Sequence, residues 1–226
     1  MARCQVMAGL QPGDTIQIMP TFGLFNGGFG FYHGARLAGL FIVPASSGNT
    51  ARQIMLMRDF KVRGIGSVVS YSARIIEMLD AQGGELPDLK IGIFGAESFS
   101  DEMRRRVEAR LNIKAFDIYG MTETGGVGTT GMDCEARCGI HVWEDHYLTE
   151  IVDPVTGETL PDGAVGEVVF TSLTRVAVPV IRYRTRDLTR IVSRERCACG
   201  RTSLRIDRIE GRCDDMLIVK GVNFFP

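Results

Sequence analysis

Short apolar runs alternate with helical patterns along residues 13–123, and this alternation constrains the fold most strongly. The runs are rich in β-branched and aromatic residues and are bounded by glycine and proline, which is typical of buried strands. They read DTIQIMP, GLFIVPA, GIGSVVS, LKIGIFGAE and IKAFDIYG. Because strands alternate with helices, we expect an α/β fold with a mostly parallel sheet and flanking helices.

Three segments between these runs have the pattern of amphipathic helices. They are residues 49–60, 72–83 and 100–112. In the last of them, Met103, Val107 and Leu111 recur at four-residue spacing and therefore share one helix face. Ser72 is expected to cap the middle helix, and Gly83 is expected to end it.

The pattern changes after about residue 130. Two stretches rich in turn formers, DPVTGE and PDGAVGE, are followed by segments in which apolar and polar residues alternate. Alternation with period two is typical of antiparallel strands. We therefore expect an α/β subdomain over residues 1–127 and an antiparallel β-rich subdomain over residues 128–211.

Composition argues against several classes of protein. A formal net charge of -1 gives no basic field for nucleic acid, and the longest apolar runs are too short to span a membrane. No long apolar segment of a signal peptide follows Met1. Six cysteines without a secretory signal indicate a reducing compartment, where clustered cysteines are more often metal ligands or free thiols than disulfides. We expect a cytoplasmic location, with neither nucleic acid nor membrane as a partner.

The loop DIYGMTETGG, residues 117–126, follows a predicted strand. Its glycines let the backbone turn tightly and approach a ligand. Thr122 supplies a hydroxyl that suits a phosphate, and Glu123 supplies a carboxylate that suits the magnesium of that phosphate. Ligands of α/β sheets bind beyond the carboxyl ends of strands, as here. A plain surface turn explains the same residues equally well.

Three motifs resemble those of the adenylate-forming enzymes, which include acyl-CoA synthetases, luciferases and peptide-synthetase adenylation domains. YGMTE is similar to their nucleotide motif, YRTRDL to their YRTGDL motif, and GRCDDMLIVKGVNFFP to their hinge motif. SSGNTARQIMLMRDF, FGAESFS, GIHVWEDHY and PVIRYRTRDLTRI narrow the resemblance to the phenylacetate-CoA ligase family, over nearly all of the chain. The general motif has glycine where this chain has Arg186. The resemblance to the phenylacetate ligase group implies an arginine at this position.

The resemblance implies an ATP-dependent, AMP-forming ligase with two steps. The carboxylate of an aryl acid attacks the α-phosphate of ATP, and the thiol of coenzyme A then displaces AMP from the acyl-adenylate. Residues 212–226 would be the hinge that leads to a C-terminal domain outside this chain. The family's phosphate loop is expected upstream of residue 1, and its catalytic lysine is expected in that C-terminal domain. Because both would lie outside this chain, the 226 residues alone should adenylate little.

Individual roles also come from the resemblance. The residues expected to flank the adenine are Gly95, Ala96 and Glu97 on one side, Asp117, Ile118, Tyr119 and Gly120 on the other, with Met121 as a further nucleotide contact. Thr122 would touch the phosphate, and Glu123 would hold Mg²⁺. Asp187 would accept hydrogen bonds from both ribose hydroxyls, although alone it would fit a surface ion pair with a neighbouring arginine. Arg212 would contact the nucleotide, and Asp214 would be the residue about which the hinge turns.

The acid pocket and a metal centre are the remaining expected sites. Phe22, Phe25 and Tyr71 are candidates to line an aromatic-acid pocket, and core packing explains each of them equally well. A second set, two cysteine groups and a histidine, fits a tetrahedral Zn²⁺ site, with free buried thiols as the alternative. The resemblance implies Cys134, His141, Cys197 and Cys199 as its ligands, in a structural role, and Cys138 could replace one of them.

Two other functions remain open. The chain could be a nucleotide-binding remnant without catalysis, or part of a related synthetase that adenylates another aryl acid or a deazaflavin coenzyme. An exposed strand end and an uncovered face would favour self-association, so we expect a homodimer.

Overall fold

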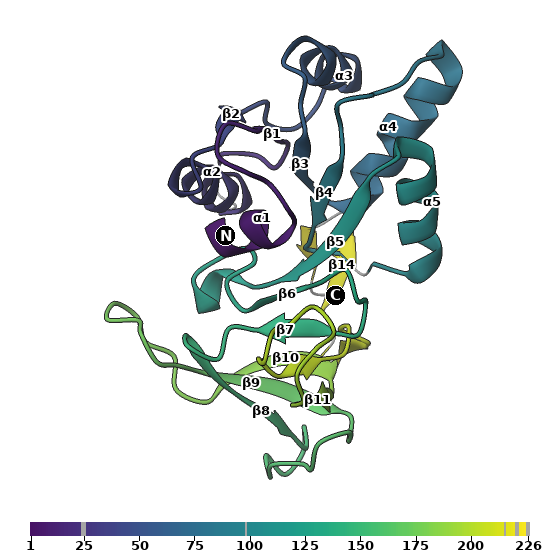
Figure 1. The fold of residues 1–226 in the computed structure, drawn as a ribbon. Coiled ribbons are helices and arrows are strands. Elements are labelled where there is room, and N and C mark those ends of the chain that lie inside the picture. The colour runs from purple at the N-terminus through teal and green to yellow at the C-terminus, as the bar shows by residue number, and fades with distance from the viewer. Residues whose placement is uncertain (24–25, 98, 215, 220–221, 225–226) are drawn as a thin grey trace. The chain divides into compact units, whose positions relative to one another are not determined.

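The computed structural model describes residues 1–23, 26–97, 99–214, 216–219 and 222–224 (Figure 1). They fall into two compact units. The α/β unit contains residues 1–118 and 126–128, and the β unit contains residues 119–125 and those from 129 onward. No helix in the described part of the chain is long and apolar enough to cross a membrane. The division predicted from the sequence, at residues 127 and 211, remains a prediction.

The α/β unit is built on a parallel sheet with the strand order β5-β4-β3-β1-β2. The strands are β1 (Thr15–Ile18), β2 (Phe41–Val43), β3 (Gly64–Ser67), β4 (Ile91–Phe94) and β5 (Lys114–Tyr119). Each is part of one apolar run of the sequence. The predicted parallel sheet is therefore confirmed.

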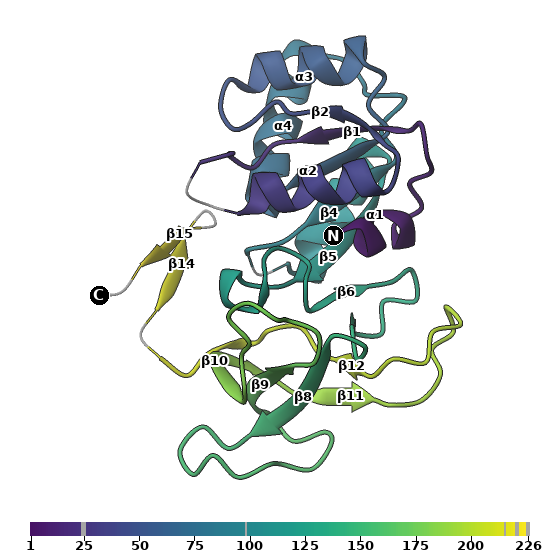
Figure 2. The same cartoon turned by 90° about the vertical axis from the view of Figure 1, so that its left-hand side faces the viewer.

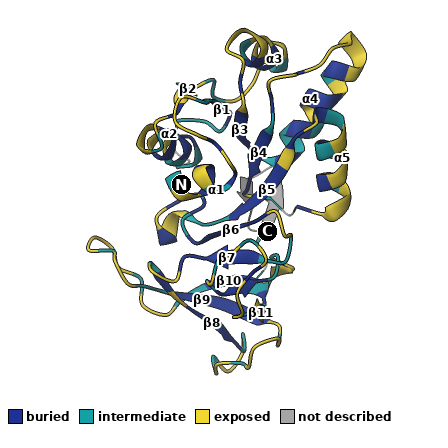
Figure 3. Cartoon of the chain, viewed as in Figure 1, coloured by how far each residue is buried: buried dark blue, intermediate teal, exposed yellow. Residues whose placement is uncertain are grey.

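Helices cover both faces of this sheet. They are α1 (Ala2–Met7), α2 (Gly27–Leu37), α3 (Thr50–Asp59), α4 (Val69–Gln82) and α5 (Asp101–Leu111). α1 and α2 lie on one face, and α4 and α5 lie on the other (Figure 1). Val107 and Leu111 of α5 are buried in the core cluster, and Met103 packs against it, as the spacing predicted. Figure 3 shows the strands buried between helices that expose their outer sides.

One local expectation about a helix start is corrected. α4 begins at Val69, three residues before Ser72, and the Ser72 side chain is buried inside the helix instead of capping it. Gly83 does end α4, with φ +72°. α2 was not predicted, because its four glycines give it low helix propensity. Its path depends on packing: a Cβ on Gly34 would lie 2.7 Å from the Cβ of Met1, so only glycine allows α1 this close.

The β unit contains two antiparallel sheets and a hairpin. The first sheet, in the order β11-β12-β7-β6, consists of β6 (Gly131–Asp133), β7 (Ile140–Val142), β11 (Ile191–Ser193) and β12 (Arg205–Ile206). The second, in the order β13-β10-β9-β8, consists of β8 (Tyr147–Val152), β9 (Gly166–Ser172), β10 (Tyr183–Thr189) and β13 (Gly211–Arg212). The hairpin pairs β14 (Leu217–Val219) with β15 (Val222–Phe224) (Figure 2). The predicted antiparallel part is confirmed, and its core includes Ile151, Val168, Phe170 and Ile206.

Candidate functional site

Asp187 is the centre of a polar cluster in the β unit. It lies on β10 opposite Arg212 of β13, because these two strands pair in antiparallel register. The hydroxyl of Tyr119 donates to Asp187 Oδ2 at 2.5 Å, and Arg212 Nη1 donates to Asp187 Oδ1 at 2.6 Å. Only 7% of Asp187 is exposed. Residues from three separate motifs therefore meet at one carboxylate.

Arg212 also joins Asp214 to this cluster. Its Nε and Nη2 atoms donate to Asp214 Oδ1 and Oδ2, each at 2.7 Å, which is the bidentate geometry of a strong arginine–carboxylate pair. One guanidinium thus orients two carboxylates, Asp187 and Asp214.

The protonation of the cluster follows from burial and charge. Burial raises the pKa of the Asp187 carboxyl, and the hydrogen bonds from Tyr119 and Arg212 lower it in part. Burial and the charge of Asp187 raise the pKa of the Tyr119 hydroxyl well above its usual value, so it stays a donor. The hydrogen bond from Arg212 lowers the pKa of Asp214. Each carboxylate oxygen has two acceptor positions, so one bond to the protein leaves a position on each Asp187 oxygen for a ligand.

The loop after Tyr119 turns two side chains outward. Residues Thr122–Thr124 form a single 3₁₀ turn in which Thr122 and Glu123 are exposed and Thr124 is fully buried. Thr124 Oγ1 accepts from the Met121 N–H at 3.3 Å and donates to the Met121 carbonyl at 3.1 Å. The Tyr147 hydroxyl donates to the Thr124 carbonyl. The buried threonine anchors the loop, in which the residues Thr122 and Glu123 are exposed.

Sequence reasoning missed several groups of this site. Thr124 and Tyr147 hold the loop, and Arg175 donates to the carbonyl of Glu123. Burial and the negative charges of Glu123 and Asp187 raise the pKa of the Tyr183 hydroxyl, whereas the charge of Arg212 lowers it in part. Tyr183 is the first residue of the YRTRDL stretch, which was the available signal for it.

In the α/β unit, the expected adenine contacts lie at the carboxyl ends of two neighbouring strands. Gly95, Ala96 and Glu97 follow β4, and Asp117 and Ile118 are the two residues before the last residue of β5; Asp117 pairs with the last residue of β4. A Cβ on Gly95 would lie 2.8 Å from Ile118 Cγ1, so this approach of the two strands requires glycine.

Glu97 has a structural contact that the sequence did not reveal. Its Oε2 accepts the Ser70 N–H at 2.9 Å, and its Oε1 accepts from Ser70 Oγ at 2.8 Å. Ser70 is the second residue of α4, so the carboxylate satisfies a backbone donor of the first turn. A remote carboxylate thus caps α4 in place of the expected serine.

The candidate residues of the acid pocket have different neighbours. Phe22 makes edge contacts with Phe29 and Tyr32, at ring-centroid distances of 5.5 and 6.3 Å. Tyr71 lies in the first turn of α4, and its hydroxyl is 3.2 Å from Thr50 Oγ1. Phe25 lies outside the described residues. Their part in a pocket remains a prediction.

The four predicted metal ligands come together in the β unit. The ligand atoms of Cys134, His141, Cys197 and Cys199 all lie within 4.8 Å of one another. Cys134 Sγ is 3.8 Å from Cys197 Sγ, and Cys199 Sγ is 3.4 Å from His141 Nε2. In a tetrahedral zinc site with usual bond lengths, two sulfurs lie about 3.8 Å apart and a sulfur and a nitrogen about 3.5 Å apart. The spacing therefore fits Zn²⁺.

The surroundings also suit a metal. His141 Nδ1 lies 3.0 Å from Ser203 Oγ, a contact that turns Nε2 toward the thiols. Burial and the charges of Arg201 and Arg205 lower the pKa of His141 to about 4, so the imidazole is neutral, as a ligand must be. Cys138 Sγ is 3.4 Å from Cys197 Sγ but accepts from Arg205 Nη1 at 2.7 Å, and it is not in the group of four.

The family model of the AMP-binding enzymes matches residues 2–174. The chain belongs to the AMP-binding enzyme family. It is 47% identical over 229 residues to a phenylacetate-coenzyme A ligase of Pseudomonas putida, a match over 100% of this chain and 51% of that protein. A phenylacetate-coenzyme A ligase of Escherichia coli K12 is 46% identical over 230 residues, which cover 100% of this chain and 52% of the relative. The chain thus spans about half the length of these curated relatives.

Solved structures agree with this assignment. A 2-hydroxyisobutyryl-CoA ligase in complex with 2-HIB-AMP and CoA superposes with a TM-score of 0.91 at 27% identity, over 100% of this chain and 49% of that one. The amide bond synthetase McbA of Marinactinospora thermotolerans has a TM-score of 0.68 at 17% identity, with 99% of this chain and 46% of that chain covered. The second likeness concerns the fold alone. The resemblance expected from the motifs is confirmed.

Proposed function

We propose that this chain is the central, nucleotide-binding part of an ATP-dependent, AMP-forming ligase that joins phenylacetate to coenzyme A. One observation carries the proposal: Asp187 is held by Tyr119 and Arg212 with an acceptor position left on each oxygen. Two adjacent hydroxyls, as on a ribose, match two such positions. The identity to phenylacetate-coenzyme A ligases supports the choice of acid.

The residues of the β unit would divide the work on the nucleotide. Asp187 would accept from the ribose hydroxyls, and Arg212 would hold it in place while touching the nucleotide. Tyr119, Gly120 and Met121 would line the base. The adenine contacts expected from the α/β unit, at Gly95, Ala96, Glu97, Asp117 and Ile118, remain predictions.

The chemistry needs positioning and charge stabilisation at phosphorus. The exposed Thr122 hydroxyl would donate to the phosphate, and the exposed Glu123 carboxylate would hold Mg²⁺. Bound Mg²⁺ would neutralise phosphate charge. A carboxylate oxygen of the acid attacks the α-phosphate and pyrophosphate leaves; the thiol of coenzyme A then attacks the acyl carbon and AMP leaves. Asp214, paired with Arg212, would be the hinge residue between the two steps.

A structural Zn²⁺ at Cys134, His141, Cys197 and Cys199 belongs to the same proposal. The distances among the four ligand atoms support it. The ion would tie the segment around β7 to the loop after β11 within the β unit. We also propose a cytoplasmic location, because zinc ligation needs free thiols and all six cysteines, which lie in the described ranges, are free.

A second candidate keeps the chemistry and changes the acid. The likeness to a 2-hydroxyisobutyryl-CoA ligase favours a small aliphatic hydroxy acid. Calorimetric competition on the 226-residue chain separates the two, with non-hydrolysable adenylate analogues that carry phenylacetyl, benzoyl or 2-hydroxyisobutyryl groups. We expect the phenylacetyl analogue to bind most tightly. Equal affinity for all three analogues would refute an aromatic-acid pocket in this chain, and preference for the aliphatic one would favour the second candidate.

A further inference from the structure

Residues 185–187 of β10 form a bulge opposite β9, and Asp187 is its last residue. Arg184 pairs with Val169, and Leu188 pairs with Glu167, so three residues of β10 face Val168 alone. A bulge takes backbone groups out of the regular ladder, and these groups need other partners.

Side chains supply the partners of two successive N–H groups in this bulge. The N–H of Arg186 donates to Glu167 Oε1 at 2.9 Å, and the N–H of Asp187 donates to Thr185 Oγ1 at 3.1 Å. Thr185 Oγ1 in turn donates to the carbonyl of Val168 at 2.7 Å. Arg186 has φ +68°, a left-handed conformation that a residue with a side chain adopts only when its surroundings impose it.

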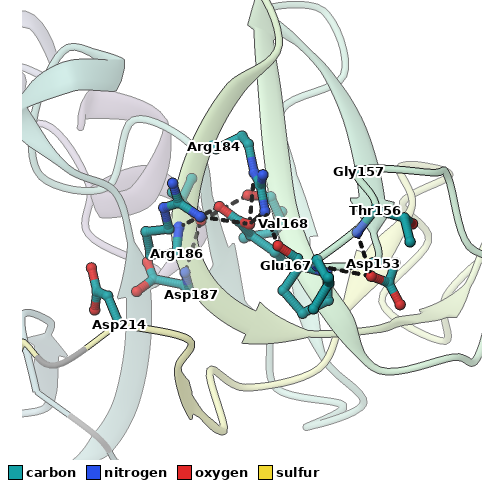
Figure 4. A network of polar contacts seen from close by, with 12 residues as sticks. Asp153, Thr156, Gly157, Glu167, Val168, Arg184, Arg186, Asp187 and Asp214 are labelled. Atoms are coloured by element: carbon teal, nitrogen blue, oxygen red, sulfur yellow. Dashed lines mark hydrogen bonds and ion pairs between the residues drawn. The ribbon is translucent and has the colours of Figure 1, made fainter.

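Glu167 is fixed from its other side. Its carboxylate is fully buried, and Oε2 accepts from Arg184 Nε at 2.8 Å and also contacts Arg184 Nη2. Arg186 Nη1 lies 3.7 Å from the same oxygen, and Figure 4 shows both arginine side chains beside Glu167. Arg184 is itself held by the Pro154 carbonyl, at 2.6 Å from Nη2. These donors hold the Glu167 carboxylate, and its Oε1 in turn holds the Arg186 N–H, so the contacts form one buried network that stiffens the bulge.

The bulge is also bonded to the segment that holds the other charged groups of the cluster. The carbonyl of Arg186 accepts from the N–H of Cys213 at 2.8 Å, and Cys213 stands between Arg212 and Asp214. The backbone of the bulge is therefore connected directly to the segment that carries the guanidinium partner of Asp187.

We propose that Glu167 and Thr185 are positioning residues of the nucleotide site: they bind the backbone of the bulge and so set where the Asp187 carboxylate meets the ribose. Neither touches the nucleotide. The functional part of this inference rests on the proposed role of Asp187, whereas the positioning itself can be measured without a ligand.

Matched variants separate positioning from general damage. Glu167→Gln removes the charge and one of the two acceptors that Arg184 and Arg186 need. Thr185→Val keeps the shape of the side chain and removes the hydroxyl, and Thr185→Ser keeps the hydroxyl and removes the methyl. Glu150→Gln is the control, because Glu150 pairs with Arg182 at 3.2 Å in the same sheet and takes no part in the bulge contacts described above.

The ligand readout is the ratio of two affinities, for an adenylate analogue with an intact ribose and for its 2′,3′-dideoxy form. We expect the wild type to bind the ribose form at least about tenfold more tightly, since the dideoxy form cannot donate hydrogen bonds to the charged Asp187 carboxylate. Glu167→Gln and Thr185→Val should bring this ratio close to one, and Thr185→Ser and Glu150→Gln should preserve it. A merely structural role would weaken both analogues alike and leave the ratio unchanged.

A second readout needs no nucleotide. In protein labelled with ¹³C at the aspartate carboxyl, the Asp187 resonance is assigned by its loss in Asp187→Asn. It should shift in Glu167→Gln and Thr185→Val, and stay in place in Thr185→Ser and Glu150→Gln. An unmoved resonance in the first two variants would overturn the inference. If the wild type shows no preference for the ribose form while the Asp187 resonance shifts as expected, the proposed contact of Asp187 with the ribose is refuted. The positioning of Asp187 by Glu167 and Thr185 is then retained.

Discussion

Replacing Cys197 by serine tests the proposed zinc centre by a change at one atom. Cys197 Sγ lies 3.8 Å from Cys134 Sγ, and a serine hydroxyl does not replace a thiolate on zinc. The variant should therefore lose the ion while it keeps a side chain of similar size. The effect on the free energy of unfolding follows from the number of residues in the loop that the ion would close.

Cys134 and Cys197 are separated by 63 residues, so zinc would close a long loop of the β unit. A cross-link that closes a loop of this length removes about 4 kcal/mol of chain entropy from the unfolded state. In a chain of this size, 1 kcal/mol shifts the midpoint of thermal unfolding by about 2–4 °C. We therefore expect Cys197→Ser to lower the unfolding midpoint by about 10 °C.

The assay combines metal analysis of the purified chain with scanning calorimetry. The wild type, expressed with added zinc, should carry one zinc per chain, and Cys197→Ser should carry none. Cys213→Ser is the control, because Cys213 is exposed and outside the group of four. Cys138→Ser should keep the ion, since that thiol is bonded by Arg205. A wild type without stoichiometric zinc, or an unchanged midpoint in Cys197→Ser, would refute the reasoning.

Three further predictions concern pH, a helix cap and assembly. Because burial raises the pKa of Asp187, affinity for an adenylate analogue should fall as the pH drops through a midpoint above the usual aspartate value of about 4, and Asp187→Asn should lack this acid limb in calorimetric titrations. Glu97→Ala should lower the free energy of unfolding by about 1 kcal/mol in urea, because α4 loses its cap, whereas Glu77→Ala, which breaks an exposed pair on the same helix, should change it by less than about 0.5 kcal/mol. We expect a homodimer in light scattering, because Val176 and Ile181, in the segment between β9 and β10, are 97% and 78% exposed. Aspartate at both positions should give a monomer, and a monomeric wild type at high concentration would contradict the expectation.

The parallel sheet could be predicted because its strands carry their signal locally. Each strand is a short β-branched run, and Val107 and Leu111 mark the buried face of α5 by spacing alone. The start of α4 could not be predicted, since its cap is Glu97, 27 residues away from Ser70. α2 was missed for a similar reason, because its glycines matter only once α1 packs against Gly34.

The candidate site shows the same difference between local motifs and contacts of residues far apart in the sequence. The sequence motifs were enough to name Thr122, Glu123 and Asp187 as candidates, and their roles stay predictions. Their supports could not be named, because Tyr119 and Asp187 are 68 residues apart, and Thr124 and Tyr147 are 23 apart. Such pairs depend on strand register and burial, which local patterns do not encode.

The most direct test of the account is calorimetric titration of the chain and of Asp187→Asn with a phenylacetyl-adenylate analogue. Asp207→Asn is the matched control, because Asp207 pairs with Arg190 at 2.7 Å elsewhere in the β unit. We expect one analogue per wild-type chain, affinity lower by at least about tenfold in Asp187→Asn, and unchanged affinity in Asp207→Asn. Equal binding by the wild type and Asp187→Asn, or no binding by the wild type, would contradict a nucleotide site centred on Asp187.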